Sequence, residues 1–373
     1  MRRTWFWVSL GIAIGVMPLV AAGCASHLAG VIVTAPNAGL GLAQVEALPD
    51  VATGREPEYR FRVTVGPPTA SLAVRVLDPA ASPLLGVTAE PRSDSPGRYR
   101  FHLVYADPSQ VVEVEGGPAG PQATVLVLHG LFGRKDTLPT MWARMLAGAG
   151  YRAVLVDMRG HGRSTGHYVS YGVRESRDLV QVIDDLERRG LLVGRLGVLG
   201  ISFGGSTAIQ LAAIDDRVEA VVALAPFNTM REAVSDFGRA VAGPLGPFLP
   251  EGMIQRAVTA TESRTGVDPA LSNAGAALGR TRAAVLLVHG QQDVHVPVAH
   301  SVALRRAMQG PGHLMVLAGE THMTLTATPG PSLVDVSEEA VSWFDHWLLD
   351  EDGAQPLPTE HLLVTGEPAA GGE

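Results

Sequence analysis

A serine flanked by glycines lies between a predicted buried strand and a predicted helix, in the run Gly200-Ile201-Ser202-Phe203-Gly204. Such a turn exposes the serine hydroxyl and points it toward the start of a helix, where N–H groups and the helix dipole favour negative charge. A serine in this setting can attack a carbonyl carbon when a nearby base accepts its proton. Ser202 is therefore the candidate nucleophile.

A candidate base and a candidate acid follow the serine in chain order. Asp293 lies in a loop after the next-to-last predicted strand, and His322 follows the last one. Groups placed just past the carboxyl ends of parallel strands converge on one edge of the sheet. We expect His322 to be the base and Asp293 the acid that orients it. His295 is the competing base, and Asp268 and Asp335 are the competing acids.

Three other histidines lie at predicted strand ends or turns, and we expect them to shape loops. His129 and His289 each precede a glycine, and His161 lies in a glycine-rich turn. No pair of histidines has the spacing of metal ligands with supporting acids, so we predict no catalytic metal and no cofactor.

The remaining sequence predicts the elements that position these groups. Short alternating strands are predicted at 60–65, 71–77 and 99–105. Apolar strands are then predicted at 124–128, 152–157, 196–199, 218–224, 283–288 and 314–317, with helices at 138–150, 173–189, 203–213 and 336–349. Strands that alternate with helices indicate an α/β fold with a doubly wound, mostly parallel sheet.

Four segments do not follow this alternation within or around the main domain, 59–350. Residues 24–58 are rich in Ala, Gly and Pro, and predict a tether that leads into the fold. Extra strands are expected in 86–118, and a helical cap that sets selectivity is expected in 228–280. The polar, acidic residues 351–373 predict a flexible tail.

Four separated motifs resemble the α/β-hydrolase superfamily over roughly residues 59–350. They are HGLFG at 129–133, DMRGHGRS at 157–164, the turn at Ser202, and an HGxxDxxxP loop that carries Asp293. The sequence is most similar to single-domain esterases and serine-aminopeptidase-like hydrolases within that superfamily. The extra strands in 86–118 depart from its minimal fold.

The resemblance implies a serine hydrolase that cleaves a carboxylic ester through a Ser-His-Asp triad and an acyl-enzyme. It also implies an oxyanion hole formed by the backbone N–H groups of Phe203 and Leu131, with Phe132 as the alternative to Leu131. An aminopeptidase, amidase or acyltransferase of the same fold is a second interpretation. A non-catalytic binding lipoprotein is a third.

The start of the chain resembles a bacterial lipoprotein signal peptide. Two arginines precede the apolar run 5–20, and small residues stand before Cys24. The resemblance implies removal of residues 1–23 and lipid attachment at Cys24, with an uncleaved anchor or an ordinary secretory peptide as alternatives. Ala25 in place of Asp favours sorting to the outer membrane. We therefore expect a lipid-anchored protein of the bacterial cell envelope.

Composition narrows the possible partners. The 373-residue chain has a formal net charge of −8 and one cysteine. A single cysteine excludes an intramolecular disulfide framework and any metal site built from several cysteines. An acidic chain lacks the basic face that nucleic acid requires. The expected partners are a small ester or amide substrate and a membrane.

Overall fold

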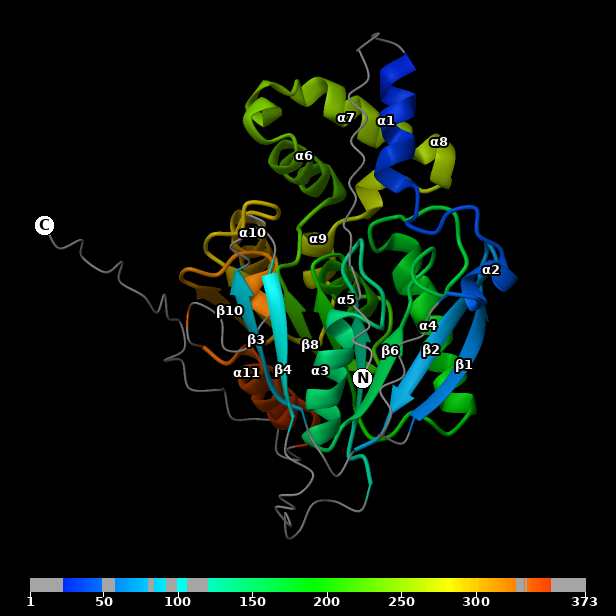
Figure 1. Cartoon of the computed structure of the whole chain (residues 1–373), viewed down its shortest axis with the longest axis vertical. Coiled ribbons are helices and arrows are strands. Elements are labelled where there is room, and N and C mark those ends of the chain that lie inside the picture. Colours follow the sequence, from blue (N-terminus) through cyan, green and yellow to red (C-terminus); the bar gives the residue numbers. More distant parts are fainter. Residues whose placement is uncertain are drawn as a thin grey trace, which may run out of the picture.

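An eight-stranded sheet lies at the centre of the computed structural model (Figure 1). The structure describes residues 23–48, 58–79, 84–91, 99–105, 120–326, 332 and 334–349, so residues 1–22 of the predicted signal peptide and the predicted tail lie outside the described residues. The strand order is β1-β2-β6-β5-β7-β8-β9-β10. The strands are β1 (Glu58–Val65), β2 (Ala70–Leu77), β5 (Thr124–Leu128), β6 (Arg152–Val156), β7 (Leu196–Ile201), β8 (Val218–Leu224), β9 (Ala284–Gly290) and β10 (Gly312–Leu317).

Strand direction follows the sequence pattern. Six neighbouring strands, in the order β6-β5-β7-β8-β9-β10, are parallel to one another. Strand β2 runs antiparallel to both β1 and β6. Every residue of β5, β6, β7 and β9 is buried, as expected of strands covered on both faces. The predicted α/β fold with a doubly wound, mostly parallel sheet is confirmed.

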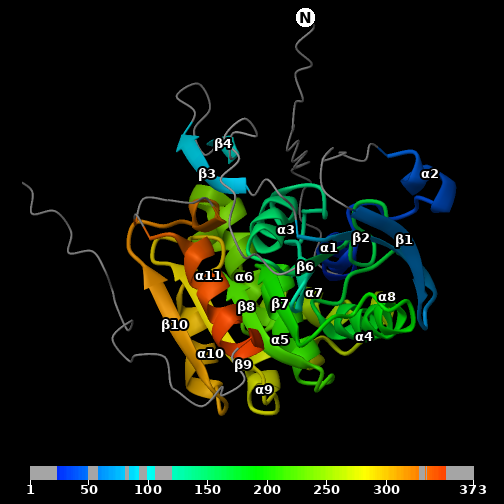
Figure 2. The same ribbon diagram turned by 90° about the horizontal axis from the view of Figure 1, so that it is seen from below.

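Helices cover both faces of the sheet (Figure 2). Helices α3 (Leu138–Gly148) and α11 (Val336–Phe344) share one core, which contains Trp142 and Trp343. Helices α4 (Val173–Arg188), α5 (Phe203–Ala212) and α10 (Ala299–Ala307) share the other. In α4, Leu179, Ile183 and Leu186 form one buried stripe, which is the pattern of an amphipathic helix.

The strand order reverses at β5. This strand lies between β6 and β7. The chain continues from β5 to β6 on one side, and the next strand, β7, lies on the other side of β5. Loops that leave the carboxyl ends of two such strands diverge and leave a crevice, which is where open α/β sheets bind ligands. The loop after β5 starts at His129 and the turn after β7 contains Ser202, so both predicted motifs meet at this crevice.

Residues 228–280 form a mainly helical insertion between β8 and β9. Its elements are α6 (Met230–Val241), η1 (Gly243–Phe248), α7 (Glu251–Ala260), α8 (Glu262–Thr265), η2 (Pro269–Leu271) and α9 (Ala274–Leu278). Helices α6 and α7 extend beyond the carboxyl edge of the sheet (Figure 1), whereas α9 packs against α5. The insertion therefore stands next to the crevice.

The described part of 24–58 is folded, in contrast to the tether that we predicted there. It contains α1 (Gly23–Val33) and α2 (Leu42–Glu46), and the side chains of Ala29, Val33 and Val45 are fully buried. Helix α1 has no Asp, Glu, Lys or Arg, and its only strongly polar side chains are Ser26 and His27, so its sequence lacks the periodicity that reveals most surface helices. No helix within the described ranges is long and apolar enough to span a membrane.

A small separate sheet accounts for part of the extra strands. Strand β3 (Leu84–Pro91) pairs with β4 (Tyr99–Tyr105) in an antiparallel hairpin outside the main sheet. Strand β3 lies beside α3 (Figure 1). Residues 106–118 of the predicted segment lie outside the described residues.

Candidate active site

The predicted nucleophile occupies a strained turn between β7 and α5. Ser202 has φ 54° and ψ −110°, a conformation that non-glycine residues rarely adopt. Its N–H donates to the Leu224 carbonyl (2.7 Å), which ties the turn to the neighbouring strand. A Cβ on Gly200 would overlap the Gly204 carbonyl, and a Cβ on Gly204 would overlap the end of β5. The two flanking glycines therefore allow the close approach that this turn requires.

The structure brings the predicted acid and base together. His322 Nδ1 lies 2.6 Å from Asp293 Oδ2. The other carboxylate oxygen, Oδ1, accepts the backbone N–H groups of His295 and Val296, both at 2.9 Å. Burial alone raises the pKa of Asp293, but hydrogen bonds from His289 and His322 outweigh it and hold this pKa well below its ordinary value. Asp293 is thus an ionised acceptor that fixes the His322 ring.

The Ser202 hydroxyl makes no hydrogen bond to any residue that the structure describes, so Ser202 and His322 are not joined directly. Such bonds are often long without substrate and tighten when substrate binds. The side chain of His322 remains 18% exposed, which leaves its ring open on one side. The structure thus pairs His322 with Asp293, and the Ser202 hydroxyl has no hydrogen-bond partner among the described residues.

The competing acids have other roles in the structure. Asp335 caps α11 by accepting the N–H groups of Ser337 and Glu338, and Asp268 caps η2 by accepting that of Ala270. Capping aspartates satisfy helix N–H groups that would otherwise have no acceptor. Neither group is paired with a histidine.

Two of the remaining histidines are held by loop contacts. His129 Nε2 accepts the Met158 N–H (2.9 Å), and burial lowers the pKa of His129 to about 3. His289 Nε2 lies 2.7 Å from the Val296 carbonyl, and its Nδ1 lies 2.7 Å from the Ser301 hydroxyl. Both rings therefore have polar partners from the loops that we expected them to shape.

His161 links both predicted oxyanion donors. Its Nε2 lies 2.5 Å from the Leu131 carbonyl, and its ring centroid lies 5.8 Å from that of Phe203. The turn that carries Leu131 closes through a bond from the Gly133 N–H to the Gly130 carbonyl (2.9 Å). Phe203 is the first residue of α5, so its N–H has no acceptor within the helix. Sequence analysis placed His161 in a turn but missed its contact with Leu131.

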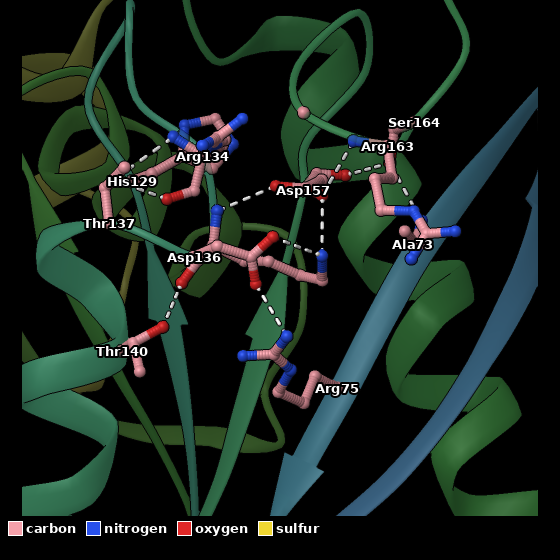
Figure 3. Close-up of polar contacts among 12 residues, drawn as sticks. Ala73, Arg75, His129, Arg134, Asp136, Thr137, Thr140, Asp157, Arg163 and Ser164 are labelled. Carbon is pink, nitrogen blue, oxygen red and sulfur yellow. Dashed lines mark hydrogen bonds and ion pairs between the residues drawn. The ribbon is translucent and has the colours of Figure 1, made fainter. Parts of the chain in front are cut away.

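A buried charge network supports residues 129–135, the predicted oxyanion loop (Figure 3). Arg75 of β2 pairs with Asp136 (2.8 Å), and the Lys135 ammonium contacts both Asp136 and Asp157 at 3.1 Å. The four side chains are at most 3% exposed, and their charges balance. The network escapes sequence analysis because Arg75, Asp136 and Asp157 are far apart in the chain.

The Asp157 carboxylate also accepts backbone N–H groups from two loops. It accepts those of Lys135 (2.7 Å) and Arg163 (2.9 Å), so it joins the oxyanion loop to the turn after β6. Breaking a buried, hydrogen-bonded charge pair typically costs about 3–5 kcal/mol. The loop that carries Leu131 therefore has a rigid base.

Gly162→Ala is expected to destabilise the protein by about 3 kcal/mol or more. Gly162 has φ +48°, and a Cβ there would overlap the Asp157 carboxyl group. Gly190→Ala is the matched control, because Gly190 has φ +67° but nothing within 4 Å of the added Cβ. The left-handed conformation alone costs about 1–2 kcal/mol. Urea unfolding checks the difference, and equal losses in the two variants would contradict the role of Asp157.

A row of rings crosses the mouth of the site. Phe132 of the oxyanion loop lies 6.0 Å from Phe237 of α6, and Phe237 lies 6.0 Å from His295. His295 in turn lies 5.9 Å from His322. Phe132 is 64% exposed. The insertion thus supplies an apolar wall beside the acid–base pair.

Comparisons with known proteins show similarity in sequence and in fold. Residues 119–269 match the model of the X-Pro dipeptidyl-peptidase (S15) family. An uncharacterized Bacillus subtilis protein, YqkD, is 26% identical over 203 residues, which are 53% of this chain and 64% of that protein. The chain therefore spans somewhat less than two thirds of this curated relative.

Two solved structures share the fold. An esterase of Pyrococcus furiosus is 16% identical with a TM-score of 0.51, covering 85% of this chain and 98% of the esterase. An acylaminoacyl peptidase of Pyrococcus horikoshii is 13% identical with a TM-score of 0.52, covering 79% of this chain and 42% of the peptidase. The sheet and these matches define an α/β-hydrolase fold.

Proposed function

We propose that this protein is a serine hydrolase that cleaves carboxylic esters. The observation that carries the proposal is the 2.6 Å contact between His322 and the ionised Asp293, at the same sheet edge as the strained Ser202 turn. Three such groups form the constellation that activates a serine for attack on a carbonyl. A binding protein without catalysis has no use for a strained serine at the same sheet edge as an oriented imidazole.

The proposed reaction has two halves. In the first, Ser202 Oγ attacks the ester carbonyl, and His322 takes the hydroxyl proton and gives it to the departing alkoxide. In the second, water attacks the acyl-enzyme, and His322 takes the water proton and returns it to Ser202. The N–H groups of Leu131 and Phe203 stabilise the oxyanion, and losing one such donor typically costs about 10²–10³ in rate.

A peptidase is the second candidate, because residues 119–269 match the S15 peptidase model. Both activities use the same acyl-enzyme chemistry, so the triad does not distinguish them. Rates over esters of graded chain length, measured beside matched amides, separate the two. A higher kcat/KM for amides would favour the peptidase.

Fluorophosphonate labelling tests the proposed chemistry directly. The probe forms a covalent bond with an activated serine, so the native protein is expected to label strongly. The Ser202→Ala variant should label at background level and keep its circular dichroism spectrum. Equal labelling of both proteins would refute the proposal.

We also propose that Cys24 carries lipid and attaches the protein to the bacterial cell envelope, at the outer membrane. The support is the sequence alone: the apolar run 5–20 and the small residues before Cys24. Cells fed radiolabelled palmitate should incorporate label into the native chain, and Cys24→Ser should remove it. Label that persists in the variant would show that Cys24 is not the acylated residue.

A further inference from the structure

Helix α1 is fixed to the body of the protein at its carboxyl end. Thr34 forms an antiparallel bridge with Tyr168, and the Val169 N–H donates to the Val33 carbonyl (2.9 Å). One residue further on, the Ala35 N–H donates to the His167 carbonyl (3.0 Å). The chain therefore enters the fold through backbone hydrogen bonds, which leave the carboxyl end of α1 little freedom.

The amino-terminal half of α1 is held by the insertion. Helix α1 packs against α7 and α8, and Ala29 is fully buried. Arg264 of α8 donates to the Ser26 carbonyl from Nε (3.2 Å) and from its terminal nitrogen (2.9 Å). The start of α1 therefore has a defined position on the insertion, as Figure 1 shows.

No spacer separates α1 from the apolar start of the sequence. The run 5–20 ends three residues before Gly23, and no Asp, Glu, Lys or Arg occurs between Arg3 and Glu46. An α-helix rises about 1.5 Å per residue, so the eleven residues of α1 extend only about 16 Å. A membrane that holds the apolar run 5–20, or that holds a lipid on Cys24, therefore lies close to the insertion.

The same edge of the molecule exposes apolar side chains. The α6–α7 turn contains η1, in which Leu245 is 69% and Phe248 is 80% exposed. The charges that flank this turn, Arg239 and Glu251, pair with each other at 2.6 Å. In Figure 1 the turn and the amino-terminal end of α1 lie at the same end of the molecule.

We propose that this edge, formed by the amino-terminal end of α1 with Leu245 and Phe248, lies against a lipid bilayer. A bilayer is the occupant that fits, because an uncharged chain runs from an apolar segment straight into α1 and the neighbouring turn presents large apolar groups. Exposed aromatic and aliphatic side chains on such a turn insert at the lipid boundary. The inference rests on the proposed membrane attachment but not on the proposed chemistry.

Photocrosslinking in vesicles tests this orientation. The full chain, purified from the membrane fraction, would carry p-benzoylphenylalanine in place of Phe248 or, as the control, of Ile214. Ile214 is also an exposed apolar residue, at 50%, but it lies between α5 and β8, at the opposite edge of the sheet. The vesicles would contain phosphatidylglycerol and radiolabelled phosphatidylethanolamine.

We expect at least about tenfold more lipid adduct at position 248 than at position 214. Equal adducts in protein that floats with the vesicles would overturn the proposed orientation. Protein that does not float would overturn the membrane attachment and the orientation together. Fluorophosphonate labelling of the same samples reports the chemistry separately, so a failure of the hydrolase proposal is recognised independently.

Discussion

His322→Ala is expected to lower kcat toward an activated ester by about 10⁶-fold, because the serine then has no base. The ring is held by Asp293 at 2.6 Å, whereas His289 lies 3.5 Å from the same carboxylate and is fully buried. Losing the base of a serine triad alone removes nearly the whole catalytic contribution of the triad. Folding should be unaffected, since His322 is partly exposed.

His295→Ala is the matched control for this variant. The ring centroid of His295 lies 5.9 Å from that of His322, and His295 is the competing base that the sequence offers. Burial, followed by the charge of His322, lowers the pKa of His295. Steady-state kinetics should show a change in kcat of less than about tenfold, because the substitution removes only the packing of His295 against Phe237. A large loss in His295→Ala with an unchanged rate in His322→Ala would reverse the assignment of the base.

Asp293→Asn is expected to lower kcat by about 10⁴-fold through the wrong imidazole tautomer. Two backbone N–H groups, of His295 and Val296, point at one carboxylate oxygen. They hold the oxygen of the new amide, so its NH₂ group faces His322 Nδ1. That nitrogen must then accept a hydrogen bond, which moves the ring proton to Nε2. A protonated Nε2 cannot take the proton of Ser202.

Asp335→Asn is the control for this substitution. Asp335 caps α11, and asparagine caps helices about as well as aspartate, so both stability and rate should be preserved. Stopped-flow acylation and urea unfolding of both variants check the comparison. A rate in Asp293→Asn within about tenfold of the native rate would remove Asp293 from the proposed triad.

Elements with a clear hydrophobic period were predictable from the sequence. Strand β5 and helix α4 fall where their patterns place them, because a strand buried on both faces and an amphipathic helix have distinct signatures. The contact between Asp293 and His322 was predictable for a topological reason: both follow parallel strands that end at the same edge.

Other features depend on contacts that no local pattern reveals. Helix α1 is mostly apolar without a clear period, so its sequence gives no sign of the insertion that packs against it. The pairing of Arg75 with Asp136 and the contact of His161 with Leu131 join residues from separate strands and loops. These contacts arise only once the sheet order places β2, β6 and β5 side by side.

The predicted oxyanion loop is fixed at both ends, and the Phe132 side chain in its middle is exposed. His129 accepts the Met158 N–H at one end, and the Lys135 N–H donates to Asp157 at the other. For protein engineering this defines a compact design window of residues 130–134, in which Phe132 already faces solvent. Libraries restricted to positions 132 and 134 can change the contact of this loop with Phe237 of α6 while the supporting network keeps the loop in place.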